Sequence, residues 1–204
     1  MSTMDTHAAT DIDWRFETPR LRARLVEGRD RDLYRSLYTD AAVMAHIGAV
    51  MCEAEADVVF DKVLGYNAET QIRARYWRLS DRSTDDAIGI QSFIRPLADP
   101  ASLELGMMLL PQSQGLGLGS EASQRFVDLL LGNHWGLDIE SVFARHAETN
   151  ARVARLGATL GFGHVDRPPE SAVTLEPPIE RPAAPPEEWR LSRQEWRALR
   201  STAR

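Results

Sequence analysis

The 204-residue chain has one cysteine, Cys52. Of its 24 basic residues, one is a lysine, Lys62, and the others are arginines. A single cysteine excludes an intrachain disulfide and a cysteine-rich zinc cluster, so we expect a cytoplasmic protein without a metal. No run approaches the roughly 20 apolar residues that span a bilayer, and we expect no membrane partner. Residues 1–13 lack the basic start and the apolar run of a targeting signal and are expected to form a disordered leader.

The formal net charge of −6 argues against general binding to nucleic acid. The length suits one domain, here residues 14–204, with a hydrophobic core of its own. Most of the 11 prolines lie within residues 167–188, which therefore cannot form a regular helix or a central strand. We expect a proline-rich surface loop there.

The spacing of apolar residues predicts alternating strands and helices. Short apolar runs indicate strands, and longer segments with apolar residues three and four apart indicate helices. The expected strands are 20–26, 76–79, 87–94, 103–110, 141–146 and 162–165, with a last one near Trp189, and the expected helices are 29–38, 54–74, 119–131 and 151–160. This order predicts an α/β (α+β) fold in which helices flank one sheet.

The most informative segment is Gln114–Ala122, in which alternating glycines separate an apolar strand from a helix. Glycine permits φ > 0, so successive N–H groups there can converge on an anion at the helix N-terminus. A Walker loop is excluded, because Ser120 and Glu121 stand where Lys and then Ser or Thr are needed. A dinucleotide fingerprint fits loosely, but it would need repeated strand-helix units beyond the loop, whereas only 85 residues follow Gly119 and part of them is proline-rich. The spacing Gln114-x-x-Gly117-x-Gly119 fits a third type, the loop that holds the pyrophosphate of coenzyme A.

Several motifs, taken in order, resemble the GNAT superfamily of acyl-CoA-dependent N-acetyltransferases, and within it the ribosomal-protein alanine acetyltransferases. They are Glu17 to Leu25, Tyr38-Thr39-Asp40 with Val43-Met44, Ala87-Ile88-Gly89, Glu104-Leu105-Gly106, Gln114 to Ala122, and Asn150 followed by Gly161-Phe162. This resemblance covers most of the chain. It implies a GNAT fold with a central mixed, mostly antiparallel sheet of about seven strands flanked by helices, in which the fourth and fifth strands splay apart.

The same resemblance implies acetyl-CoA as cosubstrate and assigns its contacts. The pantetheine would lie along the exposed edge of Met107, Met108 and Leu109, where an N–H, for example that of Met108, would polarise the thioester carbonyl. The remaining contacts would come from the loop and from the next helix: Gln114, Gly115, Leu116, Gly117, Leu118, Gly119 and Ser120, then Asn150 and Arg155. A helix N-cap explains Asn150 equally well, and a solvated helix face explains Arg155.

The reaction implied is N-acetylation of a primary amine, either a protein N-terminal α-amine or a small-molecule amine. Glu104 is the expected general base, with His146 and Glu148 as secondary choices. Relatives often carry a proton-donating serine or tyrosine where this chain has Val153 and Gly157. The donors that remain are water, Tyr34, Tyr38 and Ser120. The alternative is a noncatalytic or weakly active acyl-CoA-binding relative.

The acceptor is hardly specified. The resemblance places it between the first two helices, within Tyr34 to Tyr66, and the proline-rich loop. Acidic residues of that loop could attract a cationic amine, although a solvated loop explains them as well. We expect a monomer or a homodimer with no specific nucleic-acid partner.

Overall fold

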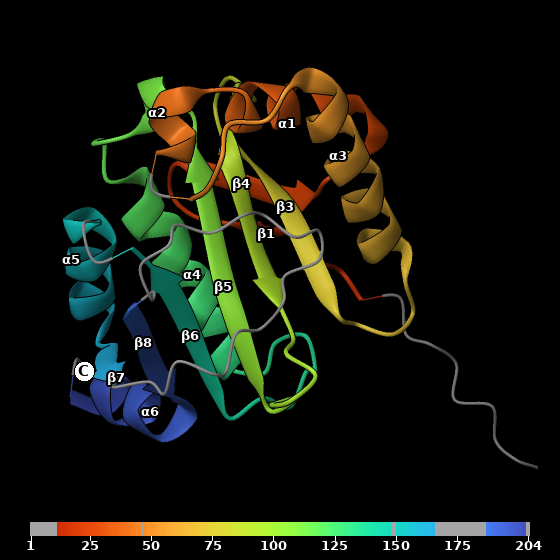
Figure 1. The fold of residues 1–204 in the computed structure, drawn as a ribbon. Coiled ribbons are helices and arrows are strands. Elements are labelled where there is room, and N and C mark those ends of the chain that lie inside the picture. The colour runs from red at the N-terminus through yellow and green to blue at the C-terminus, as the bar shows by residue number, and fades with distance from the viewer. Residues whose placement is uncertain (1–11, 46, 148–149, 166–186, 203–204) are drawn as a thin grey trace, which may run out of the picture.

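The computed structural model describes residues 12–45, 47–147, 150–165 and 187–202. Eight strands form one sheet in the order β1-β2-β3-β4-β5-β6-β8-β7, and β5 and β6 are its one parallel pair (Figure 1). The strands are β1 Phe16–Glu17, β2 Leu21–Leu25, β3 Ala74–Asp81, β4 Ala87–Ile94, β5 Ser102–Leu109, β6 Ser141–His146, β7 Gly163–Val165 and β8 Glu187–Ser192. The expected fold is confirmed, with the short β1 as an additional strand.

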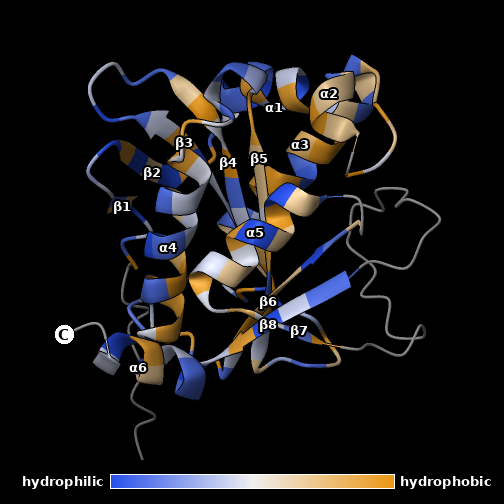
Figure 2. Cartoon of the chain, turned by 90° about the vertical axis from the view of Figure 1, so that its left-hand side faces the viewer, coloured by the Kyte–Doolittle hydropathy of each residue, from blue (hydrophilic) through white to orange (hydrophobic). Residues whose placement is uncertain are grey.

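Helices cover both faces of the sheet (Figure 2). One face carries α1 Arg31–Tyr38, α2 Ala41–Met44 and α3 Glu53–Ala68, and the other carries α4 Leu118–Leu131. Two further helices, α5 Ala151–Leu160 and α6 Arg193–Thr202, lie at the β6–β8 end of the sheet. Short 3₁₀ helices span Gly28–Asp30 and Pro111–Ser113.

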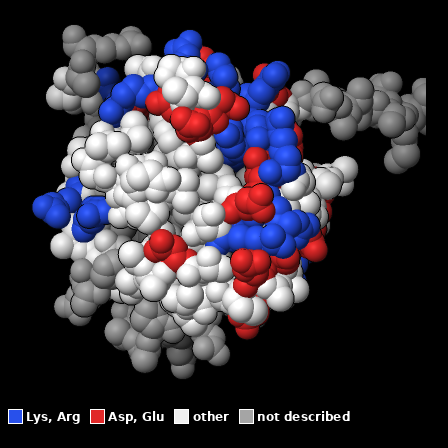
Figure 3. Space-filling model, turned by 90° about the horizontal axis from the view of Figure 1, so that it is seen from above, with Lys and Arg blue, Asp and Glu red and all other residues white. Residues whose placement is uncertain are grey.

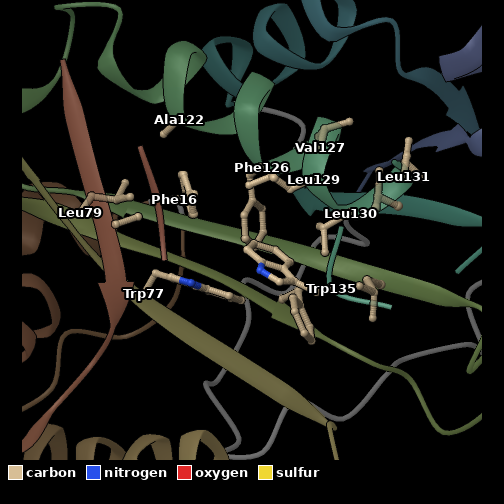
Figure 4. Close-up of a cluster of buried hydrophobic side chains, with 14 of the residues drawn as sticks. Phe16, Trp77, Leu79, Ala122, Phe126, Val127, Leu129, Leu130, Leu131 and Trp135 are labelled. Carbon is tan, nitrogen blue, oxygen red and sulfur yellow. The ribbon is translucent and has the colours of Figure 1, made fainter. Parts of the chain in front are cut away.

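The larger core lies between the sheet and α4 (Figure 4). Phe126 of α4 packs edge-on against Trp77 of β3, with ring centroids 4.9 Å apart, and it also contacts Trp135 and Phe16. The predicted apolar stripe of α4 is buried, because residues three and four apart share one face of a helix. This packing fixes the start of α4 beside the end of β5.

Several boundaries differ from the expectations by one or two residues, and the largest difference is at the end of α3. The helix expected over residues 54–74 ends at Ala68, because the Asn67 side chain bonds the backbone of Val26 and Tyr76 and draws the chain into β3. β8 begins at Glu187, inside the loop expected over residues 167–188. The rest of that loop lies outside the described residues, as does the expected leader apart from Ile12 and Asp13.

Within the described ranges, none of the helices has the length and apolar character needed to cross a membrane. Nor do three or more His, Cys, Asp or Glu side chains gather there in a way that could hold a metal ion. The absence of a metal stays a prediction.

Candidate functional site

The parallel pairing of β5 with β6 is short. It joins residues 102–104 to residues 141–143, the last pair being Glu104 and Phe143. β6 then continues along β8 as far as His146, whereas β5 continues along β4 as far as Leu109. The two strands therefore part after Glu104 and leave one edge of β5 open.

The hydrogen bonds between β4 and β5 decide which groups face this opening. The Leu110 N–H donates to the Ile88 carbonyl at 2.9 Å. Hydrogen-bonded pairs alternate along an antiparallel ladder, so Gly106 and Met108 also direct their backbone groups toward β4. The Met108 N–H is thus turned away from the opening, and the example chosen for the thioester contact is off by one residue.

Leu105, Met107 and Leu109 direct their N–H and carbonyl groups to the β6 side. The last parallel pair, Glu104 with Phe143, uses the Leu105 N–H, so the open side begins at the Leu105 carbonyl and continues through Met107 and Leu109. The Leu109 carbonyl supports this register independently, since it accepts a hydrogen bond from Gln114 Nε2 at 3.0 Å, outside the β4 ladder. The open edge of β5 consequently offers backbone groups at every second residue, which is the spacing that an added extended chain would use.

The glycine loop connects this edge to α4. Gly115 and Gly117 have φ values of +78° and +77°, which L side chains rarely adopt. Gly117 is the N-cap of α4, so the first N–H groups of the helix have no carbonyl partner within it. A Cβ at Gly119 would lie 3.2 Å from Met107 Sδ and from Leu109 Cδ1, so the helix approaches β5 closely. The arrangement suits an anion at the end of the open strand.

Glu121 ties the first turn of α4 to the start of β2. Its carboxylate accepts hydrogen bonds from Thr18 Oγ1 at 2.5 Å and from the Arg20 backbone N–H at 2.9 Å, and Arg20 Nε lies 2.6 Å away. Arg20 also donates to the Leu116 carbonyl at 3.0 Å. Burial acts to raise the pKa of Glu121, but these hydrogen bonds outweigh it and the pKa is lowered. The charged carboxylate therefore anchors the loop.

Gln114 links the loop to α5. Its Oε1 accepts a hydrogen bond from Arg152 Nη1 at 2.8 Å, while its Nε2 holds the Leu109 carbonyl. Sequence reasoning missed Arg152, because only the packing of α5 beside the loop brings the two together. The guanidinium adds a positive charge to the rim of the loop.

Two residues expected to contact the cofactor have other partners. Asn150 is the N-cap of α5, and its Oδ1 accepts a hydrogen bond from the Val153 N–H at 3.3 Å. Arg155 donates to the Ala151 carbonyl of its own helix at 3.2 Å. The N-cap explanation of Asn150 is confirmed, and its contact with the cofactor stays a prediction, as does that of Arg155.

Glu104 is buried where the strands part. Its Oε2 lies 3.2 Å from Arg145 Nη1, and Arg145 Nε lies 3.1 Å from Glu188 Oε2. The pKa of Tyr76 is raised mainly by burial and then by neighbouring charged groups, Glu104 among them. Tyr76 packs in the core on the α1–α3 face of the sheet. Glu104 therefore presents a carboxylate on that face of the opening.

The candidate proton donors lie in different places. A Cβ at Gly157 would lie 3.3 Å from the Trp189 ring, so this part of α5 is closely packed. Tyr34 and Tyr38 stack in the core of the α1–α3 face with their hydroxyl oxygens 3.2 Å apart, and burial raises the pKa of both phenols. The remaining candidates are Ser120, exposed in the first turn of α4, His146, buried at the end of β6, and Glu148, outside the described residues.

A comparison with protein-family models matches residues 20–163 to the acetyltransferase (GNAT) domain. The chain belongs to the GNAT acetyltransferase family. As a member it is an acyltransferase, and the family uses acetyl-CoA as acyl donor. The open strand edge and the glycine loop of this GNAT protein are thus its candidate acetyl-CoA site.

Solved structures share the fold at low identity. Spermidine N-acetyltransferase from Vibrio cholerae, in complex with CoA and spermine, is 17% identical with a TM-score of 0.68, covering 86% of this chain and 97% of its own. Aminoglycoside acetyltransferase AAC(6')-Ib in complex with coenzyme A is 17% identical with a TM-score of 0.69, covering 88% and 99%. A protein provisionally named a ribosomal-protein-serine acetyltransferase, from Vibrio cholerae, is 14% identical with a TM-score of 0.69, covering 88% and 98%. No curated protein matches the chain by sequence.

Proposed function

We propose that this GNAT protein transfers the acetyl group of acetyl-CoA to a primary amine, which is a protein N-terminal α-amine or the amine of a small molecule. The observation that carries the proposal is the open edge of β5 beside the glycine loop. The amides of pantetheine can pair with the open backbone groups of Met107 and with the Leu109 N–H as an added strand, and the start of α4 suits the pyrophosphate.

The Met107 N–H is the donor that we assign to the thioester carbonyl. Leu109 lies beside the loop, and Met107 is the next free N–H away from the phosphate site. A fixed donor aimed at the oxygen on which negative charge develops lowers the barrier to acyl transfer. Asn150 can hydrogen-bond pantetheine through Nδ2 while its Oδ1 caps α5.

Glu104 takes the proton of the attacking amine, directly or through a water. The neutral amine nitrogen attacks the thioester carbon as it gives up this proton, the carbon–nitrogen bond forms, the carbon–sulfur bond breaks and CoA leaves as a thiolate. Glu104 faces α1 and α3, so the acceptor approaches from that side, whereas the loop and α4 hold the phosphates on the other.

The surface near α2 supports an acceptor that is not a polycation. Residues 41–52 contain no Asp, Glu, Lys or Arg, and Val50 is 50% exposed. Figure 3 shows a broad uncharged area at this end of the molecule, with basic and acidic residues gathered along its margins. An α-amine next to an uncharged side chain fits this surface, and its pKa of about 8 leaves more neutral amine than that of lysine, about 10.4. The α-amine of a protein N-terminus is therefore our preferred acceptor, in line with the ribosomal-protein branch.

The function is tested by thermal-shift titration with acetyl-CoA, followed by an assay of thiol release across peptides with free N-termini and small amines. We expect stabilisation by acetyl-CoA and thiol release that depends on an amine. Absence of stabilisation would contradict the assigned site. Stabilisation without thiol release would leave the noncatalytic acyl-CoA-binding protein.

A matched pair of substitutions tests the rim of the loop. Arg152→Ala should raise the KM for acetyl-CoA about tenfold, or about 1.4 kcal/mol, because a charge beside the phosphates is lost. Arg155→Ala, on the same helix, tests the contact expected from the sequence. Because this side chain bonds the Ala151 carbonyl of its own helix, we propose that the variant changes the KM less than about twofold. Steady-state kinetics at varied acetyl-CoA measure both, and equal effects would refute the role of Arg152.

The base is tested by Glu104→Gln, with Glu188→Gln as control because both carboxylates bond Arg145. Glu104→Gln should lower kcat about 10²-fold and abolish the fall in rate at acidic pH, since a base must be deprotonated to act. Glu188→Gln should keep that acidic limb in the pH–rate profile. If Glu104→Gln also keeps it, Glu104 is not the base.

A further inference from the structure

His146 is a buried titratable group that the proposed mechanism does not yet use. It is the last residue of β6, its side chain is 3% exposed, and its Nδ1 lies 2.8 Å from the Ala147 carbonyl oxygen. Its Nε2 is buried and has no hydrogen-bond partner among the residues that the structure describes. Buried polar atoms are rarely left unpaired, so an orphaned nitrogen beside an opening indicates a group that meets a ligand.

The register places His146 across the opening from Met107. If the register of the parallel pair Ser102–Ser141 is extended along both strands, His146 of β6 comes level with Met107 of β5, although the strands have parted there. Alternation along β6 puts His146 on the same face as Val142, which packs in the α4 core with Met107. Its ring also lies 6.4 Å from that of Trp189, on which Gly157 of α5 packs. His146 thus lies under α5, opposite the N–H that we assign to the thioester, and on the face opposite Glu104.

We propose that His146 donates the proton that the departing CoA sulfur accepts, an inference that rests on the proposed acetyl transfer. Because a carbonyl can only accept, Nδ1 keeps its hydrogen on Ala147, and the proton available for transfer must be on Nε2. As the carbon–sulfur bond breaks, its electron pair goes to sulfur and the Nε2 proton follows. Neutral histidine remains, with Nδ1–H still bonded to Ala147. The proton that solvent returns to Nε2 balances the one that the amine has lost to Glu104.

The surroundings of His146 suit this role. Glu187 of β8 places Oε2 3.9 Å from Nε2, too far for a hydrogen bond but near enough to balance the charge of an imidazolium. His164 of β7 lies beyond Trp189, and Arg145 projects to the opposite face. The arginines of α5, Arg152 and Arg155, bond Gln114 and the helix backbone. The phenols of α1 lie on the other face and are poorer donors, because burial raises their pKa.

The test is His146→Asn, in which the amide nitrogen can replace Nδ1 as donor to Ala147 while the titrating atom is lost. We expect kcat to fall about 10²-fold, the KM for acetyl-CoA to change less than about twofold, and the fall in rate at alkaline pH to disappear, because a donor must be protonated to act. His164→Asn, the same change on the other side of Trp189, should leave the rate and the alkaline limb unchanged.

A kcat for His146→Asn within about threefold of the parent, or an alkaline limb that persists in it, would overturn the inference. If that variant does not fold, His146→Gln decides by the same criteria, and an alkaline limb missing from the parent enzyme overturns the inference without any variant. Absence of acetyl transfer by the parent enzyme would instead refute the proposed function, so the two failures are distinguishable.

Discussion

The parting of β5 from β6 after Glu104 is the constraint on which the rest of the site depends. Had the parallel pairing continued, the N–H groups of Met107 and Leu109 would be bonded to β6, as that of Leu105 is. Unpaired backbone groups are costly inside a protein unless something else satisfies them. Here they form a stretch of sheet edge that leads to the N-terminus of α4. The fold thereby creates an extended binding edge and an anion site in line with each other.

Charges and hydroxyls hold the strands together up to the point where they part. Arg190 Nη1 donates to Ser102 Oγ and Ser141 Oγ, each at 2.8 Å, and these hydroxyl oxygens lie 2.8 Å from each other. Further along, Arg145 bridges Glu104 and Glu188. Buried ion pairs add little net stability, because desolvation offsets their attraction, but removing one partner leaves a costly unpaired charge. The network therefore matters mainly for where it holds Glu104.

Patterns local in sequence predicted much of this structure. The glycine spacing, the apolar stripe of α4 and the N-cap position of Asn150 are encoded within a few residues, so loop, helix and cap follow directly from them. Which N–H groups face the opening depends instead on the register between strands, and the choice of Met108 missed by one residue. Likewise the contacts of Arg152 with Gln114 and of Arg145 with Glu104 depend on packing between segments far apart in the chain, so no local pattern could predict them.

The most direct test is residue-resolved amide hydrogen exchange along β5, with and without CoA. We predict fast exchange at Met107 and Leu109 in the free protein, protection of both when CoA binds, and protection of Gly106 and Met108 in both states. Protection of Met107 and Leu109 without CoA, or exchange there that CoA does not slow, would contradict the claim that this open edge binds the cosubstrate.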